Sequence, residues 1–328
     1  MSITAVDLVR WNRAGLGVGV AAWGLMLLLS ILGWVALTDL ELILLLAFWV
    51  ITPLAVPLTV SPKEGHLPRA LSRLMLLLHP LAALMGGVSF LLDVGVLAAA
   101  AAGGWFLFTV LIALLGLVRL REIKTASLAD ACLAIALMYL PIGGAWLVLA
   151  RLGLQPLGFG QHTDLLTAVH FHYIPLAALI ITGLIGQAVQ ATEHAVPRLL
   201  YRVAAGGMLI NPLLVAAGIT LNQLTGEDVL ESAAATLLAL GLIALALLSL
   251  RFILPSTRSR LAKGLLLVSS TAVCFTMLAA GAYALGNVTG AWTITISQMI
   301  AIHGWINALV FGLCGLLGWR IRARQREG

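Results

Sequence analysis

The chain of 328 residues contains ten apolar stretches that are each long enough to cross a lipid bilayer as a helix. The hydrocarbon layer is ~30 Å thick and a helix rises ~1.5 Å per residue. The stretches are rich in Leu and Ala and do not alternate with period two, so they predict helices and not the strands of a closed barrel. We therefore predict an all-α, polytopic integral membrane protein, a single transmembrane helical domain over residues 1–328, with spans at about 15–37, 41–60, 74–92, 95–118, 128–150, 165–188, 201–222, 230–250, 264–285 and 293–319.

Composition excludes an ordinary soluble protein. Only 10% of the residues are charged and 61% are apolar, with a mean hydropathy of +1.07. A soluble domain carries about 25% charged residues. The net charge of +6 lies in short loops between apolar stretches and forms no soluble basic patch, so no nucleic-acid partner is expected. The expected partners are membrane lipid and a lipophilic or small-molecule ligand.

The basic residues predict the direction of each helix. With ten spans, 18 of the 19 Lys and Arg residues fall on the side that also holds both termini, and Arg151 alone falls on the other. Short loops rich in Lys and Arg remain in the cytoplasm. Both the N-terminus and the C-terminus are therefore expected inside.

Polar side chains within the spans are the candidate site, because such groups are costly in lipid and usually face the protein interior. Helix direction and rise place most of them in one depth band, toward the outer half of the bilayer or near its midplane. His79 falls nearer the inner boundary, so it is expected to belong elsewhere. The candidates are Tyr139, His170, His172, Tyr173, Asn211, Gln298, His303 and Asn307, with His79 as the outlying member.

Each candidate also has a structural interpretation, because a buried His or Asn often bridges helices through a hydrogen bond. Asn211 beside Pro212 and His79 before Pro80 fit that role well. His170 and His172 are harder to explain this way, because both lie in one otherwise apolar helix. Side chains at i and i+2 point about 200° apart, so these two cannot bind one metal ion on a regular helix.

Two short motifs resemble a known family. The stretch Thr167–Pro175 reads TAVHFHYIP, and residues 303–308 read HGWINA. HFHY together with a later HGxxNA resembles the YndJ-like family of bacterial membrane proteins, and the resemblance covers most of the chain. It implies a multi-pass protein of the bacterial inner membrane and brings no activity with it.

The HFHY stretch also resembles the haem-binding helix of haem–copper oxidase subunit I. His162 precedes His170 by eight residues, as a further histidine does in that helix. This resemblance implies haem or copper as cofactor, bound by His170, His172 and His303, with His170 and His303 as metal ligands. The adjacent histidine pair and the HPEVY stretch of the oxidases are absent, and His79-Pro80 is followed by Leu81 and Ala82, which argues against an oxidase.

Four functions remain open at this point. The chain can bind haem, a metal ion or a lipophilic cofactor, since imidazole suits iron, copper and zinc. It can be a proton-coupled transporter in which His172 or His303 relays protons. It can be an intramembrane isomerase, cyclase or hydrolase, with His172 and His303 as acid–base groups and Tyr173 and Asn307 orienting an oxygen. It can also be an accessory subunit whose polar residues only join helices.

Overall fold

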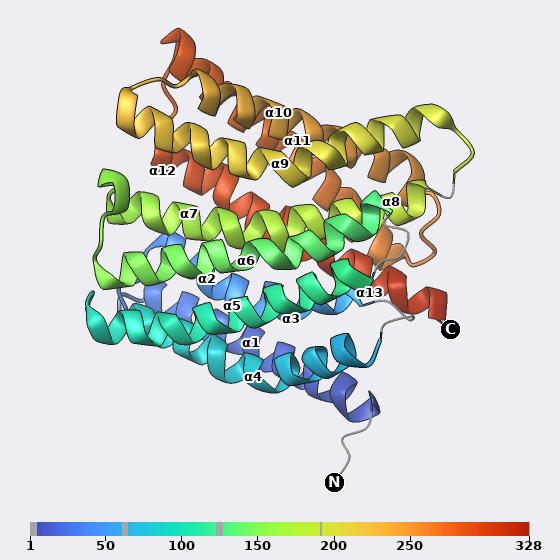
Figure 1. Cartoon of the computed structure of the whole chain (residues 1–328), viewed down its shortest axis with the longest axis horizontal. Coiled ribbons are helices and arrows are strands. Elements are labelled where there is room, and N and C mark those ends of the chain that lie inside the picture. The colour runs from blue at the N-terminus through green and yellow to red at the C-terminus, as the bar shows by residue number, and fades with distance from the viewer. Residues whose placement is uncertain (1–4, 61–64, 123–126, 191, 328) are drawn as a thin grey trace. The chain divides into compact units, whose positions relative to one another are not determined.

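The fold consists of membrane-length helices. The computed structural model describes residues 5–60, 65–122, 127–190 and 192–327, and this part of the chain contains no strand (Figure 1). Ten helical segments are long and apolar enough to span a bilayer, which confirms the predicted class: Ala14–Ile31, Asp39–Thr59, His66–Leu91, Val96–Glu122, Leu128–Leu152, Gln161–Val189, Ala195–Thr225, Val229–Ile253, Arg260–Thr289 and Ile296–Arg324. Lys63 and Lys124, two of the basic residues assigned to loops, lie outside the described residues.

The helices are longer than the apolar stretches that predicted them. The third span was expected to begin at residue 74, whereas α4 runs over His66–Leu91. Its first two turns carry Arg69 and Arg73, whose charge ended the apolar stretch but does not end the helix. Polar first turns of this kind reach beyond the hydrocarbon layer, where charged side chains are tolerated.

Several spans change to π-helical geometry part-way along. The second span consists of α2 (Asp39–Leu46), η1 (Ala47–Ile51), α3 (Thr52–Ala55) and η2 (Val56–Thr59). In η1 the Thr52 N–H donates to Ala47 O, five residues back. Pro53 has no N–H to continue this pattern, so the Phe48 carbonyl is left available to a side chain. The other π-helices are η4 (Ile174–Leu179), η5 (Ser249–Ile253), η6 (Ile300–Gly304) and η7 (Ile306–Leu313).

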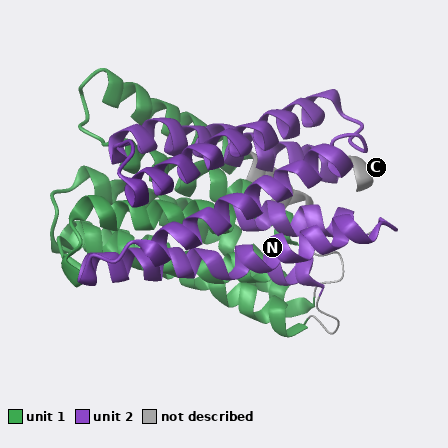
Figure 2. Cartoon of the chain, turned by 90° about the horizontal axis from the view of Figure 1, so that it is seen from above, with its two compact units in different colours: residues 1–124, 134–176 green, residues 125–133, 177–328 purple. Residues whose placement is uncertain are grey.

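The chain forms two compact units, coloured separately in Figure 2. Unit 1 comprises residues 1–124 and 134–176. It holds α1 (Ala5–Ile31), the second span, α4, α5 (Val96–Glu122), most of α6 (Leu128–Leu152) and α7 (Gln161–Tyr173). Within it α4 packs on α5 and α2 packs on α7. Gly86 of α4 permits a close approach, because a Cβ there would lie 3.0 Å from the Phe48 ring.

Unit 2 comprises residues 125–133 and 177–328. It holds α8 (Ile180–Val189), α9 (Ala195–Thr225), α10 (Val229–Leu248), α11 (Arg260–Thr289), α12 (Ile296–Met299) and α13 (Cys314–Glu327), with η5 to η7 between them. α10 packs against both α9 and α11, and α11 packs against η7 and α13. α9 and α11 end at Gly226 and Gly290, whose φ angles of 79° and 65° suit glycine. The prediction that all 328 residues form one domain stays a prediction.

Candidate functional site

His172 is the most deeply buried of the predicted site residues. It lies in α7 with no exposed surface. Its Nδ1 lies 2.7 Å from the Ala168 carbonyl oxygen, to which it donates, and its Nε2 accepts a hydrogen bond of 2.8 Å from Trp105 Nε1. Trp N–H is only a donor, so this arrangement fixes the neutral tautomer with the proton on Nδ1. Neither ring nitrogen has a lone pair left for a ligand in this conformation.

Aromatic side chains from four helical segments surround His172. We call Phe48, His79, Trp105, Phe108 and His172 the aromatic cluster. The Phe48 ring centroid lies 4.3 Å from Trp105 and 5.3 Å from His172. The Trp105 centroid lies 6.0 Å from His172 and 6.4 Å from His79. One tryptophan therefore contacts both histidines.

His79 shares an aromatic neighbour, Trp105, with His172, although its predicted depth set it apart from the other candidates. Its Nε2 donates to the Phe48 carbonyl oxygen at 2.8 Å, and its ring lies 5.6 Å from Phe108. The carbonyl is available because of the π-helix before Pro53. His79 lies near the middle of α4, and helix packing, which depth alone does not give, brings its ring beside Trp105.

A glycine leaves room for His172. Gly143 lies in α6, where an added Cβ would meet His172 Nδ1 at 2.7 Å and the Ala168 carbonyl oxygen at 3.1 Å. Real Cβ atoms do not approach a ring nitrogen this closely, so any other residue displaces the imidazole or the helix. Gly143 therefore sets the position of the ring as much as its hydrogen bonds do.

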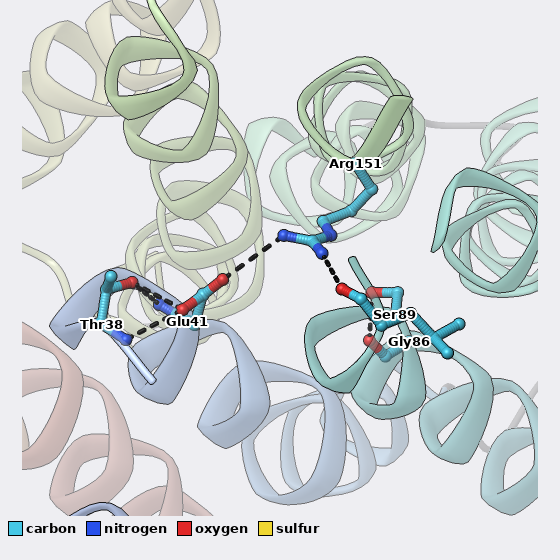
Figure 3. Close-up of polar contacts among 6 residues, drawn as sticks. Thr38, Glu41, Gly86, Ser89 and Arg151 are labelled. Atoms are coloured by element: carbon cyan, nitrogen blue, oxygen red, sulfur yellow. Dashed lines mark hydrogen bonds and ion pairs between the residues drawn. The ribbon is translucent and has the colours of Figure 1, made fainter. Parts of the chain in front are cut away.

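A buried ion pair lies at one end of unit 1. Arg151 Nη1 lies 3.5 Å from Glu41 Oε1, and Arg151 Nη2 donates to the Leu92 carbonyl oxygen at 2.7 Å (Figure 3). Glu41 Oε2 accepts from both the backbone N–H and the hydroxyl of Thr38, each at 2.9 Å. This capping box at the start of α2 orients the carboxylate toward the arginine.

Asp164 lies at the same end, in the first turn of α7. Its side chain is fully buried, and among the described residues neither carboxylate oxygen has a hydrogen-bond partner. A buried carboxylate without partners is costly. A proton or a cation that reaches this group removes that cost.

The opposite end of unit 1 carries a second buried arginine. Arg119, in the last turn of α5, donates to the Thr59 hydroxyl through Nη1, and its Nη2 lies 3.4 Å from Ser72 Oγ. The sequence placed Arg119 in a loop, but the residue is only 7% exposed. Its charge is thus held inside the helical unit.

These residues follow one another along unit 1. In the second span Glu41 comes first, Phe48 in the middle and Thr59 at the end, about 27 Å apart from first to last at the rise of a helix. Their partners on α4 to α7 follow the same order. We call Glu41, Arg151, His172, His79 and Arg119 the polar column. The column places ionisable side chains at three successive depths of a membrane-length bundle.

Unit 2 holds a smaller polar group. His303 Nδ1 lies 3.2 Å from the Thr276 carbonyl oxygen, and the Thr276 hydroxyl donates to Asn307 Oδ1 at 2.8 Å. The two predicted residues are one turn apart, in η6 and η7, and both meet Thr276 of α11. Both are half-buried, in contrast to His172.

The remaining predicted residues have separate surroundings. Tyr173 donates from its hydroxyl to the Ile43 carbonyl oxygen at 2.9 Å. His170 is exposed, and its Nδ1 donates to Leu166 O within its own helix.

The other three predicted residues lie in three different helices, α6, α12 and α9. The Tyr139 ring meets the Phe171 ring edge-on, with the centroids 6.5 Å apart. Gln298 is an exposed capping residue that pairs with Thr295, and Asn211 is buried in α9 beside Pro212.

The predicted residues thus fall into two groups. Unit 1 holds the outlying His79 together with Tyr139, His170, His172 and Tyr173, and unit 2 holds Asn211, Gln298, His303 and Asn307. Within the described residues no three or more His, Cys, Asp or Glu side chains come together as a metal site would need. The roles assigned from the sequence to these residues, including haem or copper binding, stay predictions.

Sequence reasoning missed the residues that complete the polar column. Trp105 gives no signal in an apolar stretch, although it contacts both histidines. The position of Glu41 in the first turn of α2 indicates a capping acid, and the structure confirms that role. Nothing in the neighbouring sequence indicates that Glu41 also pairs with Arg151. The one available signal was Arg151 itself, as the only basic residue that the sequence assigns to the predicted outer side.

Comparison with known proteins gives the family. The family model of YndJ-like proteins matches residues 42–311, which include the whole aromatic cluster. The chain belongs to the YndJ-like family. It is 32% identical over 243 residues to the "Uncharacterized membrane protein YndJ" of Bacillus subtilis (strain 168). That match covers 74% of this chain and 41% of the relative, so the chain spans less than half the length of that curated protein. No solved structure gives a significant match.

Proposed function

We propose that this membrane protein is a transporter in which unit 1 moves protons, alone or together with a solute. The observation that carries the proposal is the polar column, with Glu41 and Arg151 at one end, His172 and His79 in the middle and Arg119 at the other end. Ionisable side chains inside a membrane-spanning bundle are costly and typically mark the paths of ions and protons.

In this conformation His172 offers no free ring nitrogen to a second proton. The imidazole carries its proton on Nδ1, and Trp105 occupies Nε2, where a second proton would bind. Trp105 cannot pass a proton on, because the indole N–H has no acceptor lone pair. Proton uptake by His172 therefore requires Trp105 to move away from Nε2, and Trp105 acts as the gate of this path. Buried unpartnered Asp164 is the first group that a proton reaches from the Glu41 end.

Two of the three other functions expected from the sequence, cofactor binding and acid–base catalysis, find less support in this geometry. A haem or metal ion bound by His172 needs a free ring nitrogen, and both are engaged. An acid–base enzyme needs a substrate space beside its histidine, whereas the aromatic cluster fills the surroundings of His172. The Nδ1 atom of His170 donates to the Leu166 carbonyl oxygen within its own helix, and the side chain is exposed, so His170 is the residue on which cofactor binding now depends.

A flux assay in vesicles tests the transport proposal. The purified full chain is reconstituted in vesicles that enclose a pH-sensitive dye, and a potassium diffusion potential drives proton movement. We expect acidification above that of protein-free vesicles, lost in His172→Gln. The glutamine can still accept from Trp105 but cannot titrate near neutral pH.

His162→Gln is the matched control, since it makes the same change at an exposed position of the same helix. We expect it to keep the flux. Should His172→Gln fail to fold, His79→Gln tests the same path from the other side of Trp105. Flux equal to that of protein-free vesicles, with or without candidate solutes present, refutes the proposal.

We also propose that both termini face the cytoplasm and that the protein lies in the bacterial inner membrane, with Arg151 and Glu41 at the outer end. The distribution of basic residues supports this orientation. In intact cells, an impermeant maleimide should label Gln155→Cys and leave Arg258→Cys unlabelled. The reverse pattern overturns the orientation and leaves the flux experiment unaffected.

A further inference from the structure

The first turns of α9 present two arginines on one face. Arg198 and Arg202 are four residues apart, so their side chains are neighbours on the helix surface. The helix has 31 residues. At ~1.5 Å per residue it is longer than the ~30 Å hydrocarbon layer by several turns. An end of this helix therefore reaches the level of the lipid headgroups.

A hollow of about 340 Å³ lies beside these arginines. Its lining is formed by Ala195, Val196, Arg198, Leu199 and Arg202. The apolar side chains on this part of the helix are strongly exposed, at 75% for Val196 and 62% for Leu199. The hollow thus combines two cations with an open aliphatic surface. This arrangement is complementary to a molecule that carries an anionic group and an aliphatic chain.

The positive charge of the hollow is not neutralised within the described residues. Neither Arg198 nor Arg202 takes part in a salt bridge there, and Arg198 Nη2 only reaches the Glu193 carbonyl oxygen at 3.5 Å. The same end of unit 2 adds further exposed basic residues from the end of η5, the following loop and the start of α11: Arg251, Arg258, Arg260 and Lys263. The local field therefore favours an anion.

We propose that this hollow binds the headgroup of an anionic phospholipid. Each guanidinium presents a planar fork of donors that matches a phosphate. The acyl chains then lie along Val196, Leu199 and Val203, the last of which is 67% exposed. Free phosphate has no apolar part that could contact this aliphatic surface. The phospholipid is therefore the occupant that fits both parts of the hollow. The site is independent of the proton path, because it shares no residue with it.

Lipid retention tests the proposal. The full chain is placed in nanodiscs of equal parts phosphatidylglycerol and phosphatidylcholine, and the lipids that remain bound on release are counted by native mass spectrometry. Basic residues near a bilayer contribute enough for two of them to favour the anionic lipid by about tenfold or more. We expect the wild type to retain phosphatidylglycerol over phosphatidylcholine by that factor. Arg198→Gln/Arg202→Gln should lose the preference.

Arg69→Gln/Arg73→Gln is the matched control, because it removes two exposed charges, also four residues apart, from the first turns of α4 and outside the hollow. It should keep the preference. The proposal is overturned if the wild type retains both lipids equally, or if the control pair loses the preference as fully as the hollow pair. Displacement of phosphatidylglycerol by inorganic phosphate at equal concentration shows a phosphate site and also overturns it. Unchanged circular dichroism of both variants shows that they fold.

Discussion

His172 of unit 1 and His303 of unit 2 differ in burial and in hydrogen bonding. His172 of unit 1 is fully buried, uses both ring nitrogens and lies among Phe48, Trp105 and His79. His303 of unit 2 is half-buried, and its Nδ1 lies 3.2 Å from the Thr276 carbonyl oxygen. The sequence makes them look equivalent, since each lies in an apolar span within a short recognisable motif. Burial and hydrogen bonding, which the motifs do not reveal, therefore separate His172 from His303.

The largest difference between the units is expected for two acidic side chains, Glu41 in unit 1 and Glu231 in unit 2. Glu41→Ala leaves Arg151 buried without its counter-ion, which should lower the free energy of unfolding by about 3 kcal/mol. Glu231→Ala in unit 2 removes a half-buried acid that accepts from Asn222 at 2.9 Å, and should cost less than about 1 kcal/mol. Unfolding in mixed micelles, followed by circular dichroism, measures both. Equal losses of unfolding free energy in Glu41→Ala and Glu231→Ala would contradict the expected difference between the units.

The histidines themselves should differ next. His172→Phe keeps a ring in the aromatic cluster but leaves the Trp105 N–H buried without an acceptor, at a cost of about 2 kcal/mol. His303→Phe removes the 3.2 Å hydrogen bond to the Thr276 carbonyl oxygen at a half-buried position and should cost less than about 1 kcal/mol. The same unfolding assay compares them. A larger loss for His303→Phe means that the contacts drawn for His172 are not those of the folded protein.

A pair of glycine-to-alanine substitutions in unit 1 tests how closely α6 packs against His172. Gly143→Ala puts a methyl group 2.7 Å from His172 Nδ1, and such overpacking should cost about 1–2 kcal/mol. Gly103→Ala makes the same change in α5, where nothing lies within 4 Å of the new methyl group. Because alanine favours a helix over glycine, that variant should be unchanged or more stable by up to about 1 kcal/mol. Thermal denaturation in detergent separates them, and a tolerant Gly143 argues against the close packing at His172.

The smallest effect concerns Gln298, which the sequence proposed as a site residue. In the structure it forms a capping box with Thr295, so Gln298→Ala should cost about 0.5–1 kcal/mol and leave any transport unchanged. Thr295→Ala should cost a similar amount, because it removes the other half of the same box. Loss of flux in Gln298→Ala at normal stability would show that Gln298 has a role in transport beyond capping.

Most of the fold was predictable because length and hydropathy alone decide which segments cross a membrane. Asp39–Thr59 matches the expected 41–60 within two residues at each end. α4 was misplaced at its start because Arg69 and Arg73 end an apolar stretch without ending a helix. The π-helices left no signal apart from proline, although η1 is what frees the Phe48 carbonyl for His79.

The candidate site was predictable only one residue at a time. Depth along a helix identified His172 and His303, but depth says nothing about which helix face meets which neighbour. That information decided the outcome for His79, which shares Trp105 with His172. Glu41 and Arg151 were visible as charges, and their pairing depends on three separate segments meeting at the end of unit 1.

Proton flux in vesicles, measured side by side for His172→Gln and His303→Gln, decides whether protons pass through unit 1 or unit 2. If they pass through unit 1, the His172 variant falls to the level of protein-free vesicles while the His303 variant keeps the wild-type rate, both being reconstituted in equal amounts. Loss of flux in His303→Gln alone would place the path in unit 2 and leave the polar column of unit 1 with a structural role only.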